Sequence, residues 1–311
     1  MEICQRTGKP IVELSHSGLA SFNSCPKRFA FRKMVVNFQN DRGSSDAASV
    51  GTAMHEGIQE YMRTRNLAAA LEAVALHHPI DLASNTNASQ YGLEACVWTL
   101  EHVIHNSELP AYGLVNFIRD GKEVPATEIA FMVEIEFPTL MFHLRGFVDL
   151  IVQNPQTGLF LPLDIKTTTE RGAMNMEHKY KWDWQVTSYG IPLNILLQNS
   201  GDFETGIFGV IMSDREPRVI FTRHMRSQHD IDAYNYYLLD NCRRIEQYYR
   251  DNVFPRGPNA CVSYGRVCDY HAQCAVEGLE AMQMLVNPSR KPGYVGREVD
   301  PMFTIRMEGT S

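Results

Sequence analysis

The stretches MFHLRGFVDLIVQ (141–153) and LFLPLDIKTT (159–168) decide the fold of this chain. Both are rich in apolar and β-branched residues, which favour strands. Only the short segment NPQTG (154–158), with its Asn, Pro and Gly, separates them. Two strand-like runs joined by such a turn predict an antiparallel pair of adjacent strands.

The flanking segments extend this pair into an α/β pattern. TEIAFMVEIEF (127–137) partly alternates apolar and polar residues, so it predicts a preceding strand. GIFGVIMSD (206–214) and RVIFTRHM (218–225) predict two following strands. Helices are expected over the other apolar-periodic segments: 67–77, 89–105, 181–198 and about 230–251, with a first helix capped by Ser17 and a second that begins near Gly51.

The order of these elements predicts one domain over residues 1–275. It consists of an N-terminal helical part (14–125), a core that contains the strands (126–252) and a cysteine-rich segment (253–275). The remaining residues, 276–311, have the composition of a weakly structured tail.

Composition narrows the class of protein. The 311 residues are 44% hydrophobic and 21% charged, as in an ordinary globular protein, and the net charge is −7. An acidic chain argues against broad electrostatic binding of nucleic acid, but carboxylates that hold divalent cations would reverse the sign locally. No apolar run is long enough to span a membrane, and MEICQRTGKP lacks the apolar core of a secretion signal. We therefore expect a cytoplasmic protein.

The strand pair carries two carboxylates and a lysine. Asp149 lies in the first strand, and Asp164 and Lys166 lie in the second. Residues two apart in a strand point to the same face, so Asp164 and Lys166 project together. A divalent cation would compensate carboxylates embedded in apolar sequence, and Mg²⁺ or Mn²⁺ with such ligands suits phosphodiester hydrolysis. The alternative is a solvated surface ion pair, which the same triplet often forms.

Three of the seven cysteines are close together near the C-terminus. Cys261, Cys268 and Cys274 have the spacing C-x6-C-x5-C, which differs from the paired C-x2-C knuckles of most structural zinc sites. Three thiolates that need a fourth ligand predict a metal site, either an iron–sulfur cluster or zinc, and His271 could replace one cysteine. Free buried cysteines are the alternative.

Six segments, in this order, resemble the RecB-like branch of the PD-(D/E)xK nucleases, which includes phage exonucleases and CRISPR adaptation nucleases. They are LSHSGLASFNSCPKRFAF (14–31), GTAMHEGIQ (51–59), GFVDLI (146–151), LDIKTT (163–168), QVTSYG (185–190) and CVSYGRVCDYHAQC (261–274). The resemblance implies a restriction-endonuclease-like core, in which helices flank a mixed central sheet, with an N-terminal helical region and a C-terminal cysteine-ligated segment.

The resemblance also assigns roles to individual residues. It implies that His55, Asp149, Asp164 and the Ile165 carbonyl bind the catalytic metal, and that Lys166 is the catalytic lysine. Gln185 and Tyr189 would contact substrate, Glu128 would support the site, and Cys25 would complete a [4Fe–4S] or zinc site with Cys261, Cys268 and Cys274. The alternatives are a helix histidine for His55 and amphipathic packing for Gln185 and Tyr189.

The function implied is a Mg²⁺- or Mn²⁺-dependent DNA nuclease, more specifically an exonuclease for recombination or DNA end processing in a bacterial or phage-infected cell. The expected substrate is single-stranded DNA or DNA ends. No G-x-x-x-x-G-K-[ST] motif occurs, so unwinding would require a helicase or recombination partner. Two other classes remain: a non-catalytic DNA-binding or assembly protein with the same fold, and an iron–sulfur redox protein.

Overall fold

The computed structural model describes residues 1–35, 46–78, 91–191, 193, 203–213, 216–263, 266–284, 301 and 303–308. The chain forms two compact units. The first unit consists of Met1–Arg42, Ala130–Gly146 and Asp232–Ser311, and the second of Gly43–Ile129 and Phe147–Ile231.

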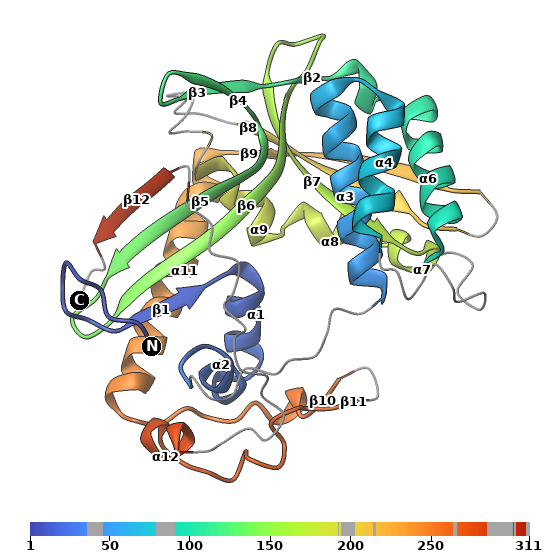
Figure 1. The fold of residues 1–311 in the computed structure, drawn as a ribbon. Helices are drawn as coiled ribbons and strands as arrows, with labels where there is room; N and C mark the ends of the chain where they lie inside the picture. Colours follow the sequence, from blue (N-terminus) through green and yellow to red (C-terminus); the bar gives the residue numbers. More distant parts are fainter. Residues whose placement is uncertain are drawn as a thin grey trace. The chain divides into compact units, whose positions relative to one another are not determined.

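The second unit is built on a mixed sheet (Figure 1). The part of β6 (Met141–Gln153) that lies in this unit pairs antiparallel with β7 (Phe160–Thr168) and with the two-residue strand β2 (Gly113–Leu114). β7 pairs parallel with β8 (Phe203–Ile211), which pairs antiparallel with β9 (Arg218–Arg226). The predicted strands and the mixed sheet are thus confirmed.

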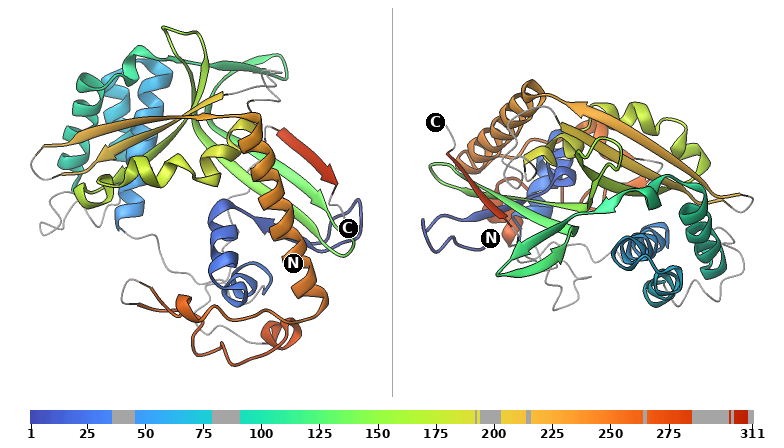
Figure 2. Two further views of the ribbon diagram at one scale, coloured as in Figure 1. Left: turned by 180° about the vertical axis from the view of Figure 1, so that it is seen from behind. Right: turned by 90° about the horizontal axis from the view of Figure 1, so that it is seen from above.

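Helices cover both faces of this sheet (Figure 2, right). One face packs against α3 (Asp46–Thr64), α4 (Leu67–His77) and α6 (Leu93–Asn106). The other face packs against the short helices α8 (Met176–Lys181) and α9 (Trp184–Ser188), which follow α7 (Glu170–Ala173). The mixed sheet flanked by helices that the sequence predicts is therefore present.

Alternation along β7 decides which side chains enter the core. Leu163 and Ile165 are fully buried in the cluster formed with α3, α4 and α6. Asp164 and Lys166, at the intervening positions, point to the opposite face, where α9 lies. Apolar packing on one side thus fixes the direction of the charged side chains on the other.

Three helix predictions need correction. The segment 181–198 is not one helix, because α8 ends at Lys181 and Asp183 starts α9 by accepting a hydrogen bond from the Gln185 amide. Ser15, not Ser17, caps the first helix, since its hydroxyl accepts from the Gly18 amide. The helix expected near Gly51 already begins at Asp46. In the first two cases a polar side chain bonds to the backbone at a position that periodicity does not locate.

The first unit contains the two ends of the chain. Its strand β1 (Ile11–Leu14) pairs parallel with the first residues of β6, and α1 (His16–Ser24) and α2 (Pro26–Lys33) follow. Pro26 occupies the first turn of α2, where its missing amide costs nothing, so the chain breaks between the two helices. Most of α11 (Gln228–Arg250) also belongs to this unit, which contains the hairpin β10 (Val262–Ser263) and β11 (Arg266–Val267).

Two secondary-structure elements lie within the segment 276–311. α12 (Leu279–Gln283) follows the cysteine segment, and β12 (Phe303–Glu308) pairs parallel with β5 (Thr127–Glu136). Residues 285–300, 302 and 309–311 lie outside the described residues. The division into a domain over 1–275 and a tail stays a prediction.

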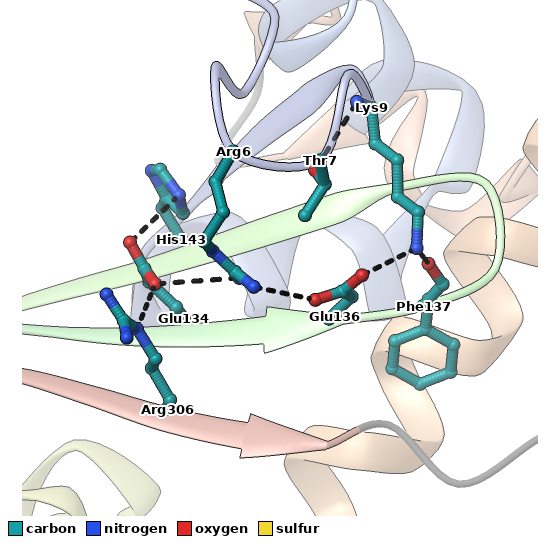
Figure 3. Close-up of polar contacts among 8 residues, drawn as sticks. All are labelled: Arg6, Thr7, Lys9, Glu134, Glu136, Phe137, His143 and Arg306. Atoms are coloured by element: carbon teal, nitrogen blue, oxygen red, sulfur yellow. Dashed lines mark hydrogen bonds and ion pairs between the residues drawn. The ribbon is translucent and has the colours of Figure 1, made fainter.

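Ion pairs connect both chain ends to β5 (Figure 3). Arg306 of β12 lies 3.1 Å from Glu134, and Arg6 lies 3.2 Å from Glu136. Lys9 contacts Glu136 at 2.9 Å and donates to the Phe137 carbonyl at 2.7 Å. Exposed pairs of this kind contribute at most about 1 kcal/mol each, so the network mainly orients the ends.

The remaining elements are short: η3 (Leu109–Ala111), the hairpin of β3 (Asn116–Arg119) and β4 (Lys122–Pro125), and η4 (Pro258–Ala260). Among the described residues, no helix has the length and apolarity needed to cross a membrane.

Candidate active site and cysteine cavity

The carboxylates of β6 and β7 lie where the ladder between these strands ends. The last paired residues are Leu150 and Leu163, and Asp149 and Asp164 are the next residues on each strand. Beyond this point the Ile165 amide no longer bonds to the neighbouring strand and donates instead to Asp149 Oδ2 at 2.7 Å. The end of the ladder therefore frees backbone groups and gathers two acidic side chains.

Asp164 is the most enclosed acidic group of the site, with a 2% exposed residue surface. Lys166 Nζ lies 2.7 Å from its Oδ2. Tyr189 donates to its Oδ1 at 2.5 Å, and Gln185 Nε2 donates to the same atom at 3.3 Å. One carboxylate is thus held by a cation, a phenol and an amide.

Gln185 and Tyr189 reach Asp164 from α9. Gln185 Nε2 donates to the Tyr189 hydroxyl at 2.7 Å, as expected for side chains four residues apart on one helical face. Burial, and then the charge of Asp164, raise the pKa of Tyr189 well above its usual value. The phenol therefore stays protonated and acts as a hydrogen-bond donor.

His55 reaches the site from α3, which covers the other face of the sheet. Its Nδ1 lies 3.7 Å from Asp149 Oδ2. Burial lowers the pKa of His55 to about 4, although the nearby negative charge of Asp164 and a hydrogen bond with the Ile165 backbone oppose this shift. A neutral imidazole is the form that can bind a metal.

The two carboxylates repel each other. Burial, and then the charge of Asp164, raise the pKa of Asp149 to about 7. Burial by itself would lower the pKa of Lys166, but the adjacent Asp164 carboxylate more than offsets this effect, so the pKa of Lys166 is raised. Glu128 of β5 adds further negative potential at both Asp149 and His55. The site thus concentrates negative charge that a cation would relieve.

The donor set fits a hard divalent cation. Carboxylate oxygens and a neutral imidazole are suitable ligands for Mg²⁺ or Mn²⁺. Asp164 Oδ2 is buried and has no hydrogen bond of good geometry, although Lys166 approaches it as an ion pair. Within the described part of the chain, no three His, Cys, Asp or Glu side chains already surround one point at ligand distance.

Four predicted cysteines line one small cavity in the first unit. Cys25, Cys261, Cys268 and Cys274 all contribute to its wall, together with His271. None of these cysteines forms a disulfide. The cavity thus collects four thiols from segments more than two hundred residues apart.

Close backbone packing brings these segments together. The Lys27 amide donates to the Pro255 carbonyl at 3.1 Å, and the Gly257 amide donates to Cys25 Sγ at 3.3 Å. A Cβ at Gly257 would lie 2.0 Å from the Ser24 carbonyl oxygen, so only glycine fits there. This glycine explains how the C-terminal segment can reach the start of α2.

Cations also line the cysteine cavity. They are Lys27, Arg28 and Arg256. Lys27 is only 1% exposed, and its Nζ has no hydrogen bond of good geometry, although Glu277 lies 3.2 Å away. Burying an ammonium ion is costly unless negative charge is nearby; the Glu277 carboxylate supplies some, and four thiolates would supply more.

The structure thus brings the predicted residues into two groups. The second unit holds the group of His55, Asp149, Asp164, Ile165, Lys166, Gln185 and Tyr189. The first unit holds the group of Cys25, Cys261, Cys268 and Cys274. Sequence reasoning assigned no functional role to the cations around the cysteines. It also missed the buried Arg226, which donates to Thr187 and Tyr180 on either side of the α8–α9 turn. No local pattern marks them, because each acts through partners distant in sequence.

Comparison with known proteins gives the family. The sequence model of the PD-(D/E)XK nuclease superfamily matches residues 13–275. No curated protein matches significantly. A crystal structure of a "Putative exonuclease" from Eubacterium rectale is 12% identical, with a TM-score of 0.47, over 89% of this chain and 100% of that one. The structure of SSO0001 is 13% identical, with a TM-score of 0.30, over 75% of this chain and 76% of that one. With the family model covering most of its length, the chain belongs to the PD-(D/E)XK nuclease superfamily.

Proposed function

We propose that this protein is a Mg²⁺- or Mn²⁺-dependent deoxyribonuclease that acts as an exonuclease. The observation that carries the proposal is the set of contacts on Asp164, which Lys166, Gln185 and Tyr189 hold beside Asp149 and His55. A surface ion pair would need none of these buried partners. The family membership supports hydrolysis of a phosphodiester bond.

Each residue of the site would have a distinct role in hydrolysis. Asp149, Asp164, His55 and the Ile165 carbonyl would hold the metal. A bound divalent cation lowers the pKa of a water ligand and stabilises negative charge on the phosphate. Lys166, released from its ion pair with Asp164, would orient the attacking water or contact a phosphate oxygen. Gln185 and Tyr189 would keep Asp164 in place and line the path of the substrate.

Electrostatic compensation supports this assignment. Two neighbouring buried carboxylates are unfavourable without a cation, and the raised pKa of Asp149 records that cost. A divalent cation between them would remove the repulsion and leave Lys166 free to interact with phosphate. The same arrangement has no evident use in a protein that only binds DNA.

The four-cysteine cavity would hold a [4Fe–4S] cluster, with zinc as the alternative. The shared cavity of Cys25, Cys261, Cys268 and Cys274 and the buried Lys27 beside it support a site of net negative charge. Such a site would fasten the C-terminal segment to the start of α2. A redox function alone would leave the carboxylate–lysine site without a purpose.

The test is degradation of end-labelled DNA by the purified protein with Mg²⁺ or Mn²⁺. We expect activity that EDTA abolishes and that Asp149→Asn and Lys166→Ala reduce to background. Glu101→Gln, on α6 of the same unit, is the matched control and should retain full activity. Persistent DNA binding without any cleavage would favour the non-catalytic alternative. Products released only from DNA ends, rather than nicked circles, would identify an exonuclease in end processing or recombination, for which a helicase would be the natural partner.

A further inference from the structure

An exposed tryptophan precedes a residue of the candidate active site by three positions. Trp182 joins α8 to α9 and is 71% exposed, although indole is among the most favourable side chains to bury. It precedes Gln185 by three residues, and Gln185 Nε2 contacts Asp164 at 3.3 Å. Three residues of chain span at most about 11 Å, so the backbone of Trp182 lies within this distance of the backbone of Gln185.

Hydrogen bonds from a buried arginine stabilise the turn that carries Trp182. Arg226 of β9 is 3% exposed; its Nε donates to Thr187 Oγ1 at 2.9 Å, and its Nη2 donates to the Tyr180 carbonyl at 3.3 Å. Asp183 caps α9 directly after the tryptophan. The indole is therefore exposed on a turn whose backbone is fixed by hydrogen bonds. This arrangement is expected of a preorganised contact residue.

One basic side chain lies at the exposed ring, and a second lies at the neighbouring Tyr180. Lys181 Nζ lies 5.4 Å from the centre of the Trp182 ring, and Lys179 Nζ lies 4.8 Å from the centre of the Tyr180 ring. An exposed aromatic ring with an ammonium group beside it matches an unpaired nucleotide, because the base can stack on the ring while the phosphate contacts the lysine. In a duplex, the faces of the bases are covered by their neighbours and are not available for such stacking.

We propose that Trp182 is a stacking platform for an unpaired base of single-stranded DNA adjoining the scissile phosphate, with Lys179 and Lys181 contacting the backbone. The proposal rests on the proposed nuclease function and names its substrate class. It assigns the α8–α9 turn a role in selecting single strands over duplex DNA.

Binding is measured apart from cleavage, by fluorescence anisotropy with labelled oligo-dT and with a blunt hairpin duplex, in the Lys166→Ala background. Stacking on one aromatic residue is worth roughly a 10-fold change in affinity or more. We expect Trp182→Ala to weaken oligo-dT binding about 10-fold, Trp182→Phe to restore most of it, and neither to change duplex binding. Trp98→Ala is the matched control, because Trp98 is also exposed (41%) but lies on α6.

A second readout uses the intrinsic fluorescence of the three tryptophans. Oligo-dT should quench the emission of the Lys166→Ala protein and of its Trp98→Phe variant, but not that of its Trp182→Phe variant. Equal affinities of the Trp182→Ala and Trp98→Ala proteins for oligo-dT, or an equal loss of duplex binding, would overturn the proposal. Failure of the nuclease function itself would appear separately, as absence of cleavage by the unmutated protein.

Discussion

Tyr189 and Asp164, 25 residues apart in the sequence, are joined by a 2.5 Å hydrogen bond between the phenol and Oδ1. The donor is fully enclosed, and its raised pKa keeps the proton on the phenol. The bond therefore fixes the orientation of the carboxylate, leaving Oδ2 toward Lys166.

Removing this hydroxyl should impair catalysis without unfolding the protein. Hydrogen bonds to charged groups contribute roughly 1.5–3 kcal/mol, so Tyr189→Phe should lower kcat/KM between about 10- and 100-fold. Steady-state cleavage rates at saturating Mn²⁺ measure the effect, with Tyr61→Phe on α3 as the control. An unchanged rate would mean that Tyr189 only packs against the sheet.

Mn²⁺ should stabilise the folded protein through Asp149. A ligand at a concentration 100 times its Kd raises the free energy of unfolding by about 2.7 kcal/mol. Thermal melts with and without Mn²⁺ should show this gain in the unmutated protein and in Glu101→Gln, but not in Asp149→Asn. Because the pKa of Asp149 is about 7, its carboxylate is ionised at pH 8 and repels Asp164. Asp149→Asn should therefore be the more stable protein when no metal is present, and the opposite order would contradict the proposed charge repulsion.

Lys27→Met should have opposite effects with and without metal at the cysteine cavity. The buried ammonium ion is costly when the thiols are neutral, so the metal-free variant should be at least as stable as the unmutated protein. With a bound cluster or zinc, the same ammonium offsets thiolate charge, so the variant should lose its metal sooner. The rate of metal release to a chelator measures this difference. Lys33→Met, later in α2 and outside the cavity, is the control, and equal release rates in both variants would rule out the electrostatic role of Lys27.

Alkylation should separate the cysteines by environment. A hydrogen bond with Thr7 lowers the pKa of Cys4, whereas burial raises the pKa of Cys96 to about 11 and that of Cys242 further still. Because the thiolate is the reactive form, iodoacetamide at pH 8 should label Cys4 and spare the two buried residues. Labelling of the four cavity cysteines should appear only after metal is stripped, as peptide mass spectrometry can show. Equal labelling of those four before and after chelation would argue against a metal site.

The packing of α3, which carries His55, depends on a glycine. A Cβ at Gly57 would lie 2.4 Å from Val74 Cγ2 and 3.2 Å from the Ala70 carbonyl oxygen. Overpacking of this kind typically costs about 1–3 kcal/mol, so Gly57→Val should lower the urea midpoint accordingly. Gly113→Val is the matched control, since nothing lies within 4 Å of a Cβ there. Equal midpoints would show that the contact between α3 and α4 yields without cost.

Some features of the site follow from local sequence alone. The two-residue period of a strand places Asp164 and Lys166 on one face, and the structure has them 2.7 Å apart. Four-residue spacing in a helix places Gln185 beside Tyr189, although the helix is much shorter than periodicity suggests. The strand pairs and the mixed sheet were equally predictable, because alternation and short turns depend only on residues that are close in the sequence.

Other features depended on contacts between distant segments. No local pattern could show that Tyr189 would donate to Asp164, that Arg226 would brace the α8–α9 turn, or that Lys27 would be buried. The ends of two helices also differ from the prediction, because the side chains of Asp183 and Ser15 accept backbone hydrogen bonds where these helices begin.

The sequence by itself determined which side chains share a face, because backbone geometry repeats over a few residues regardless of context. Only the tertiary structure decided which partners those side chains meet and how strongly burial changes their charge. Desolvation and long-range packing depend on segments that are far apart in the chain, and they gave Asp149 its raised pKa and Trp182 its exposed, braced position.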